Sequence, residues 1–259
     1  MSIRRGQFYA WALFAAGLLG WELLAREFKL SALVLPPPSV VLGTLWKGLL
    51  SGYLWPHIWQ TVLELVLGLA AGCVLGLVGG VVLGESAGLR RLLMPYVVTS
   101  QVVPKLALAP LFIVWFGFGM TSTVVITALV CFFPLMENTL TGLAQVDRQR
   151  LELFRMLGAT RWQTLLRLKL PSSLPSILAG FRIAVVLALV GAVVGEFIGG
   201  SAGLGALIIA SQGMMDTPLM FAVLVLITLL GLLLYQMSIA LEKRLLASRI
   251  TPLPKETQT

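Results

Sequence analysis

Residues 147–171 read DRQRLELFRMLGATRWQTLLRLKLP, the one long polar and basic stretch between segments that are almost wholly apolar. Asp147 is a residue type that commonly caps the N-terminus of a helix. Leu151 and Phe154 would lie on the apolar side of that helix. Gly158 tolerates the positive φ at which many helices end. The pattern therefore predicts a short amphipathic helix that ends near Gly158.

A second short helix is expected directly after this bend. Thr160 is followed three residues later by Gln163, which is the spacing of a capping box. Apolar residues then recur at helical spacing, beginning with Trp162 and Leu165, and Pro171 is expected to stop the helix. The stretch therefore predicts two short amphipathic helices with a bend between them.

The composition of the whole chain places this helix pair on a membrane protein. Of the 259 residues 58% are hydrophobic and 12% are charged, and the mean hydropathy is +0.94. A soluble domain has about twice that charged fraction. Apolar runs long enough to cross a bilayer recur at about residues 8–25, 58–84, 92–116, 121–144, 173–196 and 218–241. We therefore expect an all-α membrane protein with about six transmembrane helices, forming one domain over residues 1–259 with its core at about 58–245.

The formal net charge of +8 indicates orientation in the membrane rather than binding to nucleic acid. Most of the basic residues fall on alternate connections, as the positive-inside rule predicts for cytoplasmic segments. They are Arg4, Arg5, Arg90, Arg91, the group from Arg148 to Lys169, Lys243, Arg244, Arg249 and Lys255. Both termini and the helix pair are thus expected in the cytoplasm, with residues near Ser51 and Ser201 outside.

The helix pair resembles the EAA loop of bacterial ABC importer permeases. That loop has Glu-Ala-Ala, three residues, Gly, nine residues, and then an aliphatic residue, any residue, Leu and Pro. Glu152, Gly158, Leu170 and Pro171 stand in that register, while Leu-Phe replaces the two alanines. The stretches at 104–111 and 115–119 resemble the nitrate/sulfonate/taurine subfamily, and the resemblance covers roughly residues 35–245.

This resemblance implies a type I ABC importer fold in a bacterial inner membrane, with residues 147–171 as a cytoplasmic coupling loop. It implies three protein partners: a dimer of ATPase subunits, a second copy of this permease, and an external solute-binding protein. The chain contains no Walker A sequence, so ATP and magnesium are expected in the ATPase and the permease itself is expected to be neither catalytic nor cofactor-bound. The residues expected to couple to the ATPase are Glu152, Phe154, Arg155, Gly158, Ala159, Trp162, Leu168 and Pro171, and Leu151 and Leu165 are further candidate anchors.

Four ionisable residues within or near the apolar spans are candidates for the translocation pathway or its gate: Lys105, Glu137, Arg182 and Glu196. A lysine at membrane depth costs roughly 2.5–3.5 kcal/mol on insertion scales, so Lys105 must face water, a carboxylate or free carbonyl groups. Lys105 and Arg182 either line an anion route or gate, or they pair with Glu137 or cap freed carbonyl groups, and the sequence leaves these roles open. The leading substrate class, by resemblance alone, is a small organic anion such as a sulfonate or a taurine-like compound. Nitrate, aromatic carboxylates and uncharged vitamin precursors also remain open.

Other features of the expected spans predict packing rather than chemistry. Glycines at 68, 72, 76, 80 and 84 leave every fourth position of one span without a side chain, which favours close contact with another helix. Glu64 is either an acid that reaches the membrane interface or a gate residue. His57, the only histidine, is expected at the interface without a chemical role. The glycine-rich residues 199–205 predict a flexible external connection.

Two other classes of function compete with the importer. An ion-coupled secondary transporter or channel would use Lys105, Glu137, Arg182 and Glu196 as a relay and would need no ATPase. The EAA-like spacing and the lack of a visible inverted repeat disfavour that class. A membrane-embedded enzyme is disfavoured by the single histidine and by the lack of a metal-ligand pattern.

Overall fold

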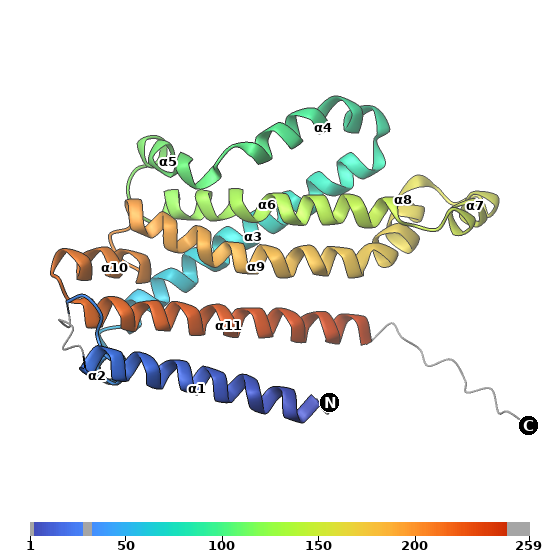
Figure 1. Cartoon of the computed structure of the whole chain (residues 1–259). Coiled ribbons are helices and arrows are strands. Elements are labelled where there is room, and N and C mark those ends of the chain that lie inside the picture. Colours follow the sequence, from blue (N-terminus) through green and yellow to red (C-terminus); the bar gives the residue numbers. More distant parts are fainter. Residues whose placement is uncertain (1–2, 28–32, 248–259) are drawn as a thin grey trace, which may run out of the picture.

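The computed structural model describes residues 3–27 and 33–247, and every regular element in these ranges is a helix (Figure 1). The longest are α1 (Ile3–Glu27), α3 (Trp55–Glu85), α6 (Met120–Ala144), α9 (Leu170–Gly199) and α11 (Thr217–Ala247). The shorter ones are α2 (Pro38–Leu50), α4 (Ala87–Val102), η1 (Lys105–Leu108), α5 (Ala109–Phe116), α7 (Arg148–Met156), α8 (Arg161–Thr164), η2 (Leu165–Lys169) and α10 (Leu204–Gly213). The expected all-α membrane fold is confirmed.

Four helices are long and apolar enough to cross a bilayer: α3, α6, α11 and the continuous helix Arg161–Gly199. A fifth candidate is formed by α4 together with Lys105–Phe116, which are bent by 82° relative to each other. The first of the roughly six expected spans coincides with α1, which does not belong to these four or five. Residues 1–2 and 248–259, including the expected basic tail at Arg249 and Lys255, lie outside the described residues.

Prolines account for the broken span. Pro95 lies inside α4, Pro104 precedes the break, and Pro110 stands in the first turn of α5. Proline lacks the backbone N–H that a helix interior requires but is well tolerated in the first turn. The chain therefore turns at Pro104, and Lys105 follows directly at the start of η1.

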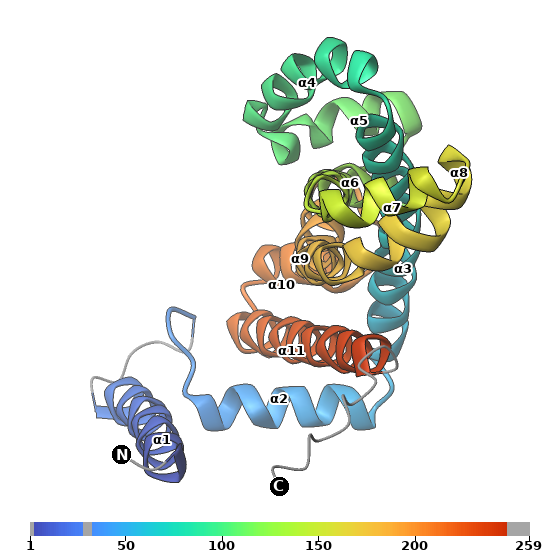
Figure 2. The same ribbon diagram turned by 90° about the vertical axis from the view of Figure 1, so that its right-hand side faces the viewer.

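The centre of the bundle is built on the glycines of α3, whose flank faces α6. A Cβ at Gly72 would lie 2.6 Å from the carbonyl oxygen of Ala128, and one at Gly76 would lie 2.6 Å from that of Phe132. A Cβ at Gly80 would lie 2.6 Å from the Cβ of Thr139. The glycines thus allow close backbone approach, which confirms the packing role expected for them. Figure 2 shows α5, α6, α9, α11 and α2 stacked in this order, with α3 along one side.

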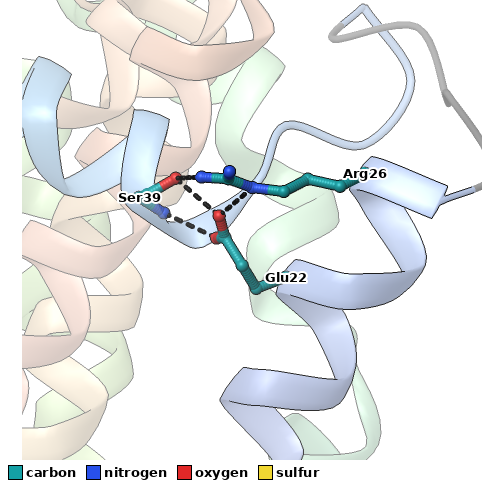
Figure 3. A network of polar contacts seen from close by, with 3 residues as sticks. All are labelled: Glu22, Arg26 and Ser39. Carbon is teal, nitrogen blue, oxygen red and sulfur yellow. Dashed lines mark hydrogen bonds and ion pairs between the residues drawn. The ribbon is translucent and has the colours of Figure 1, made fainter.

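A small polar network joins α1 to the start of α2 (Figure 3). The Glu22 carboxylate accepts hydrogen bonds from Arg26 Nε at 2.6 Å, from Ser39 Oγ at 2.8 Å and from Ser39 N at 3.0 Å. Ser39 N–H is one of the donors that the first turn of α2 leaves without a helical partner. The carboxylate therefore anchors the N-terminus of α2, whose Val41 and Leu45 are buried in a cluster with residues of α10 and α11.

The elements divide between the two ends of the bundle (Figure 1). The start of α1, the end of α11 and the helices α7 and α8 lie toward one end, whereas α2, α5 and α10 lie toward the other. Trp46, Tyr53, Trp55 and Trp59, expected at a membrane interface, belong to α2, α3 and the turn between them, and each is at least half exposed.

Candidate functional site: the polar helix pair and the Lys105 cavity

The first half of the polar helix pair (residues 147–171) is fixed by hydrogen bonds within the segment. The Asp147 side chain accepts a hydrogen bond from Gln149 N at 3.0 Å and caps α7, as predicted. Gly158 has φ +70°, and a Cβ placed there would meet nothing within 4 Å. Glycine is therefore needed for the backbone conformation and not for space. The expected bend at Gly158 is confirmed.

The second half begins with the predicted capping box but does not end where expected. Gln163 N donates to Thr160 Oγ1 at 3.2 Å, and Thr160 N donates to Gln163 Oε1 at 2.9 Å. Pro171, however, does not stop the helix, which runs without a break from Arg161 to Gly199. The prediction failed because the π-helical turn η2, in which Leu170 N donates to Leu165 O, directly precedes Pro171, so the regular hydrogen-bond pattern that proline cannot continue is already interrupted there.

An ion pair joins the helix pair to the body of the bundle. Lys169 Nζ lies 2.6 Å from Glu85 Oε1 at the end of α3, and both side chains are partly buried. Next to this pair is a cavity of about 670 Å³ between the junction of α3 with α4 and the helix pair. Its lining includes Glu85, Arg155, Arg161 and Lys169, so three basic side chains face one acid. The helix pair is thus connected to both α9 and α3.

The outer surface of the helix pair is more apolar than the basic sequence suggests. Trp162 is 66% exposed, and Leu153, Met156 and Leu157 are 49%, 79% and 73% exposed. The last three follow the i, i+3, i+4 spacing of one helix face, and we call them the apolar stripe. Sequence reasoning missed Met156 and Leu157, although continuing the helical period beyond Leu153 would have revealed them.

The predicted coupling residues divide into exposed and buried groups. Glu152, Arg155, Gly158 and Trp162 are exposed, while Phe154, Ala159 and Pro171 are partly buried. Leu168 is 7% exposed and packs inside the protein. Leu165, expected to be a contact anchor, is only 4% exposed. That expectation was wrong, because the continuous helix turns Leu165 toward the bundle and not toward solvent.

Lys105 and Glu137 share a second cavity, of about 560 Å³, between η1, α6 and α9. Lys105 Nζ lies 4.2 Å from the centroid of the Phe133 ring, a cation–π contact. Within the part of the chain that the structure describes, Lys105 forms no ion pair with a carboxylate. Gln101 and Asn138 add amide groups to the wall. The cavity therefore offers a cation, an acid, two amides and an aromatic ring.

Arg182 lies elsewhere. Its Nη1 is 3.2 Å from Glu242 Oε2 on α11, so the alternative in which Arg182 pairs with Glu137 is wrong. Arg182 does not line the Lys105 cavity, although the neighbouring Ile183 does. The two cations that the sequence grouped together thus occupy different places, one in a cavity and one between α9 and α11.

Glu196 is buried at the opposite end of the bundle from the helix pair. Its Oε1 accepts a hydrogen bond from Thr61 Oγ1 at 2.7 Å, and its Oε2 accepts one from Gly205 N at 2.6 Å. Leu204 N donates to Thr61 Oγ1 at 2.8 Å, and Gly203 N lies 3.3 Å from His57 Nδ1. We call these six residues the Glu196 cluster. Glycine-rich residues 199–205 are therefore held at several points, and the expected flexible connection was wrong.

Glu64 lies beside Glu196 and is only 1% exposed, so it does not reach the membrane interface. Gln60 Nε2 donates to Glu64 Oε1 at 2.6 Å. His57 is partly buried and contacts the backbone of Gly203, a structural contact that its expected place at the interface did not reveal. The sequence indicated neither role, since each depends on residues more than a hundred positions away in the chain.

Comparison with known proteins places this geometry in a family. Residues 72–247 match the model of the binding-protein-dependent transport system inner membrane component. The riboflavin transport system permease of Chloroflexus aurantiacus is 40% identical over 88% of this chain and 85% of its own length. The formylaminopyrimidine transport permease of Halalkalibacterium halodurans is 38% identical over 62% of this chain and 64% of its own length. The taurine transport system permease of Escherichia coli is 32% identical over 92% of this chain and 86% of its own length.

The fold has a counterpart among solved structures. An inward-facing structure of the MetNI methionine ABC transporter matches with a TM-score of 0.65 and 22% identity, covering 74% of this chain and 95% of that chain. At this identity the likeness concerns the fold alone. The family match and the relatives together establish that this chain is an inner-membrane permease of the binding-protein-dependent ABC transport family.

Proposed function

We propose that this permease forms the membrane pathway of an ATP-driven importer, and that the polar helix pair docks on a separate ATPase subunit. The observation that carries this proposal is that the apolar stripe and Trp162 are exposed on the helix pair, which lies at one end of the bundle. Apolar and aromatic side chains at the centre of an interface often dominate its binding energy. Glu152 and Arg155 would form the polar rim around them.

The connections of the helix pair support transmission of movement into the membrane. The helix from Arg161 to Gly199 is continuous, so a displacement of α8 would be carried along α9 as a rigid element. The Lys169–Glu85 ion pair links the same segment to α3. Closure of the ATPase would therefore move two spans that pack on α6. In this account Gly158, Ala159, Leu168 and Pro171 keep the shape of the segment, and Phe154 adds to the contact surface.

The proposal also includes two further protein partners and an orientation of the chain in the membrane. A second copy of this chain would complete the pathway, and an external solute-binding protein would deliver the solute. ATP and magnesium would bind in the ATPase. The helix pair and both ends of the chain would face the cytoplasm, with Ser51 and Ser201 outside. Single cysteines at these positions and at Gln149, in a background without Cys73 and Cys131, should label from the matching side, and external labelling at Gln149 would contradict the orientation.

For the substrate, we propose a small organic solute that passes the Lys105 cavity. An organic anion such as a sulfonate would be attracted by Lys105, with Arg182 and Glu196 acting as gate residues. The lining of the cavity favours a second candidate, an uncharged or zwitterionic heterocycle. Glu137 lines the same cavity and offsets the charge of Lys105, and Phe133 offers an aromatic face. Relatives named for riboflavin and for formylaminopyrimidine transport agree with this candidate.

Introducing an acid into the apolar stripe tests the docking proposal. Met156→Asp should abolish copurification of the ATPase while leaving the permease folded in the membrane. Gly88→Asp is a suitable control, because it adds the same charge in the first turn of α4, where a Cβ would meet nothing within 4 Å. Normal copurification by Met156→Asp, or equal loss by both variants, would contradict docking through the helix pair.

The solute needs a separate measurement. Competition of taurine, an alkanesulfonate, riboflavin and a pyrimidine for uptake in cells that carry the complete transporter distinguishes the two substrate classes. Inhibition by the sulfonates alone supports the anion, and inhibition by the heterocycles alone supports the second candidate.

A further inference from the structure

A second kind of ligand is indicated by an apolar groove between α3, α9 and α11, away from the Lys105 cavity. The groove has a volume of about 470 Å³. Its walls are formed by aliphatic and aromatic side chains, among them Leu65, Phe181 and Leu241. Only Ser238 and Arg244 contribute polar side chains, and the Ser238 hydroxyl already donates to Tyr235 O at 2.7 Å. Among the described residues that line this groove, Arg244 is thus the one with a charged side chain.

A smaller groove adjoins the first. It has a volume of about 260 Å³ and an entirely apolar wall from α3, α6, α9 and α11. Phe181 and Leu241 line both grooves and therefore form the ridge between them. All four helices are candidate membrane spans by length and composition, which would place these grooves next to the hydrocarbon of the bilayer. Two adjoining apolar grooves suit the two acyl chains of one lipid molecule.

Arg244 supplies the charge that selects the headgroup. It lies in the last turn of α11, at the same end of the bundle as the helix pair. Among the described residues no carboxylate lies within ion-pair distance of Arg244, and the nearby Glu242 is already paired with Arg182 at 3.2 Å. A guanidinium at the edge of an apolar groove is well placed to bind a phosphate oxygen through charge-assisted hydrogen bonds.

We propose that this double groove binds an anionic phospholipid of the surrounding membrane, with its acyl chains on either side of Phe181 and Leu241 and its phosphate at Arg244. The lipid would fill the space between α11 and the pair α3 and α9. The Arg182–Glu242 contact joins α9 to α11 near the same groove. Lipid bound there would therefore hold α11 against the helix that carries α8.

Lipid retention by the purified full-length permease tests this proposal. The permease is reconstituted into nanodiscs of phosphatidylcholine and phosphatidylglycerol in equal amounts, and the retained lipids are measured by native mass spectrometry. Wild type should retain phosphatidylglycerol in preference to phosphatidylcholine. Arg244→Gln should lower that preference by about fivefold, the effect of one basic residue near an anionic surface. Lys243→Gln is the matched control, because Lys243 is exposed in the same turn but does not line the groove.

A second variant tests the position of the acyl chains. Ala240 lines the groove and is exposed, so Ala240→Trp should fill the groove and reduce retention of either lipid without changing any charge. Equal loss of preference in Lys243→Gln and Arg244→Gln would overturn the proposal, because it would indicate diffuse attraction. Wild-type retention by Ala240→Trp would also overturn it. So would a disulfide between copies carrying Ala240→Cys, which would show that a second chain covers the groove.

Discussion

The two ends of the bundle are held in different ways. At the end that carries the polar helix pair, hydrogen bonds within the pair join residues two to four positions apart, as between Thr160 and Gln163, and the Lys169–Glu85 ion pair connects the pair to α3. At the opposite end, Thr61 and Glu196 are 135 residues apart in the chain and are hydrogen-bonded in a buried cluster. The first end can keep its shape while exposed for a partner. The end with the Glu196 cluster depends on the assembled fold. Substitutions there should therefore lower the stability of the permease rather than its coupling to the ATPase.

The largest expected effect is at Gly203 in the Glu196 cluster. Gly203 has φ +116°, and a Cβ there would collide with the Glu196 carboxyl group. Gly203→Ala combines backbone strain with overpacking, which together cost roughly 2–6 kcal/mol. We expect a large loss of folded protein and a lower midpoint of thermal unfolding in detergent.

Gly52→Ala separates strain from collision. Gly52 has φ +82°, but a Cβ placed there would meet nothing within 4 Å. The Gly52 variant should therefore lose less stability than Gly203→Ala. Equal losses would show that the contact with Glu196 is not what makes Gly203 sensitive.

Removing the Thr61 hydroxyl should have the next largest effect. Thr61→Val leaves Glu196 Oε1 and Leu204 N without the hydroxyl that both contact, at about 1–3 kcal/mol for each buried group left unsatisfied. Thermal unfolding measures the loss. Thr99→Val is the control, because the Thr99 hydroxyl bonds only the carbonyl of Pro95 in its own exposed helix turn. A Thr61 variant no less stable than the Thr99 variant would show that the cluster does not hold this end together.

The difference between the two ends of the bundle also explains which features could be predicted from the sequence. Asp147, Gly158 and the Thr160–Gln163 capping box were predictable because each acts on backbone groups within four residues. Pro171 was misinterpreted, since proline marks either the end or the first turn of a helix, and the π-helical turn before it carries no clear sequence signal. Glu64, Glu196 and His57 were recognised as unusual, but their partners lie far away in the chain. Composition and hydropathy were sufficient for α3, α6, α11 and the span that contains α9, whereas α1 is not among the helices apolar enough to cross a bilayer and the expected third span is bent by 82°.

At the end that carries the polar helix pair, Gly158→Val should stop uptake without unfolding the permease. Valine at φ +70° is strained by roughly 1–3 kcal/mol, and the bend would rearrange and misdirect α7. Uptake and copurification of the ATPase should fall, while the amount of permease in the membrane stays normal. Gly158→Asn should be milder, because asparagine tolerates positive φ better. Normal uptake by Gly158→Val would show that the bend at Gly158 is not needed for coupling to the ATPase.

The smallest effects on stability are expected from Lys105→Gln and Arg182→Gln. The first variant changes a residue in a cavity, and the second changes a residue in an ion pair. Lys105→Gln removes only a cation–π contact, about 0.5–1 kcal/mol at such a site, so a fall in uptake would come from the pathway and not from unfolding. Arg182→Gln leaves Glu242 unpaired, but both side chains are partly exposed, so we expect only a modest loss of stability. We expect lower uptake from both variants with near-normal yield of folded permease.

The double variant Arg182→Gln with Glu242→Gln distinguishes two roles for Arg182. If Arg182 is a static tie between α9 and α11, the double variant should restore uptake. If Arg182 is a gate that needs the charge, uptake should stay impaired. Wild-type uptake by Arg182→Gln alone would exclude Arg182 from the gate.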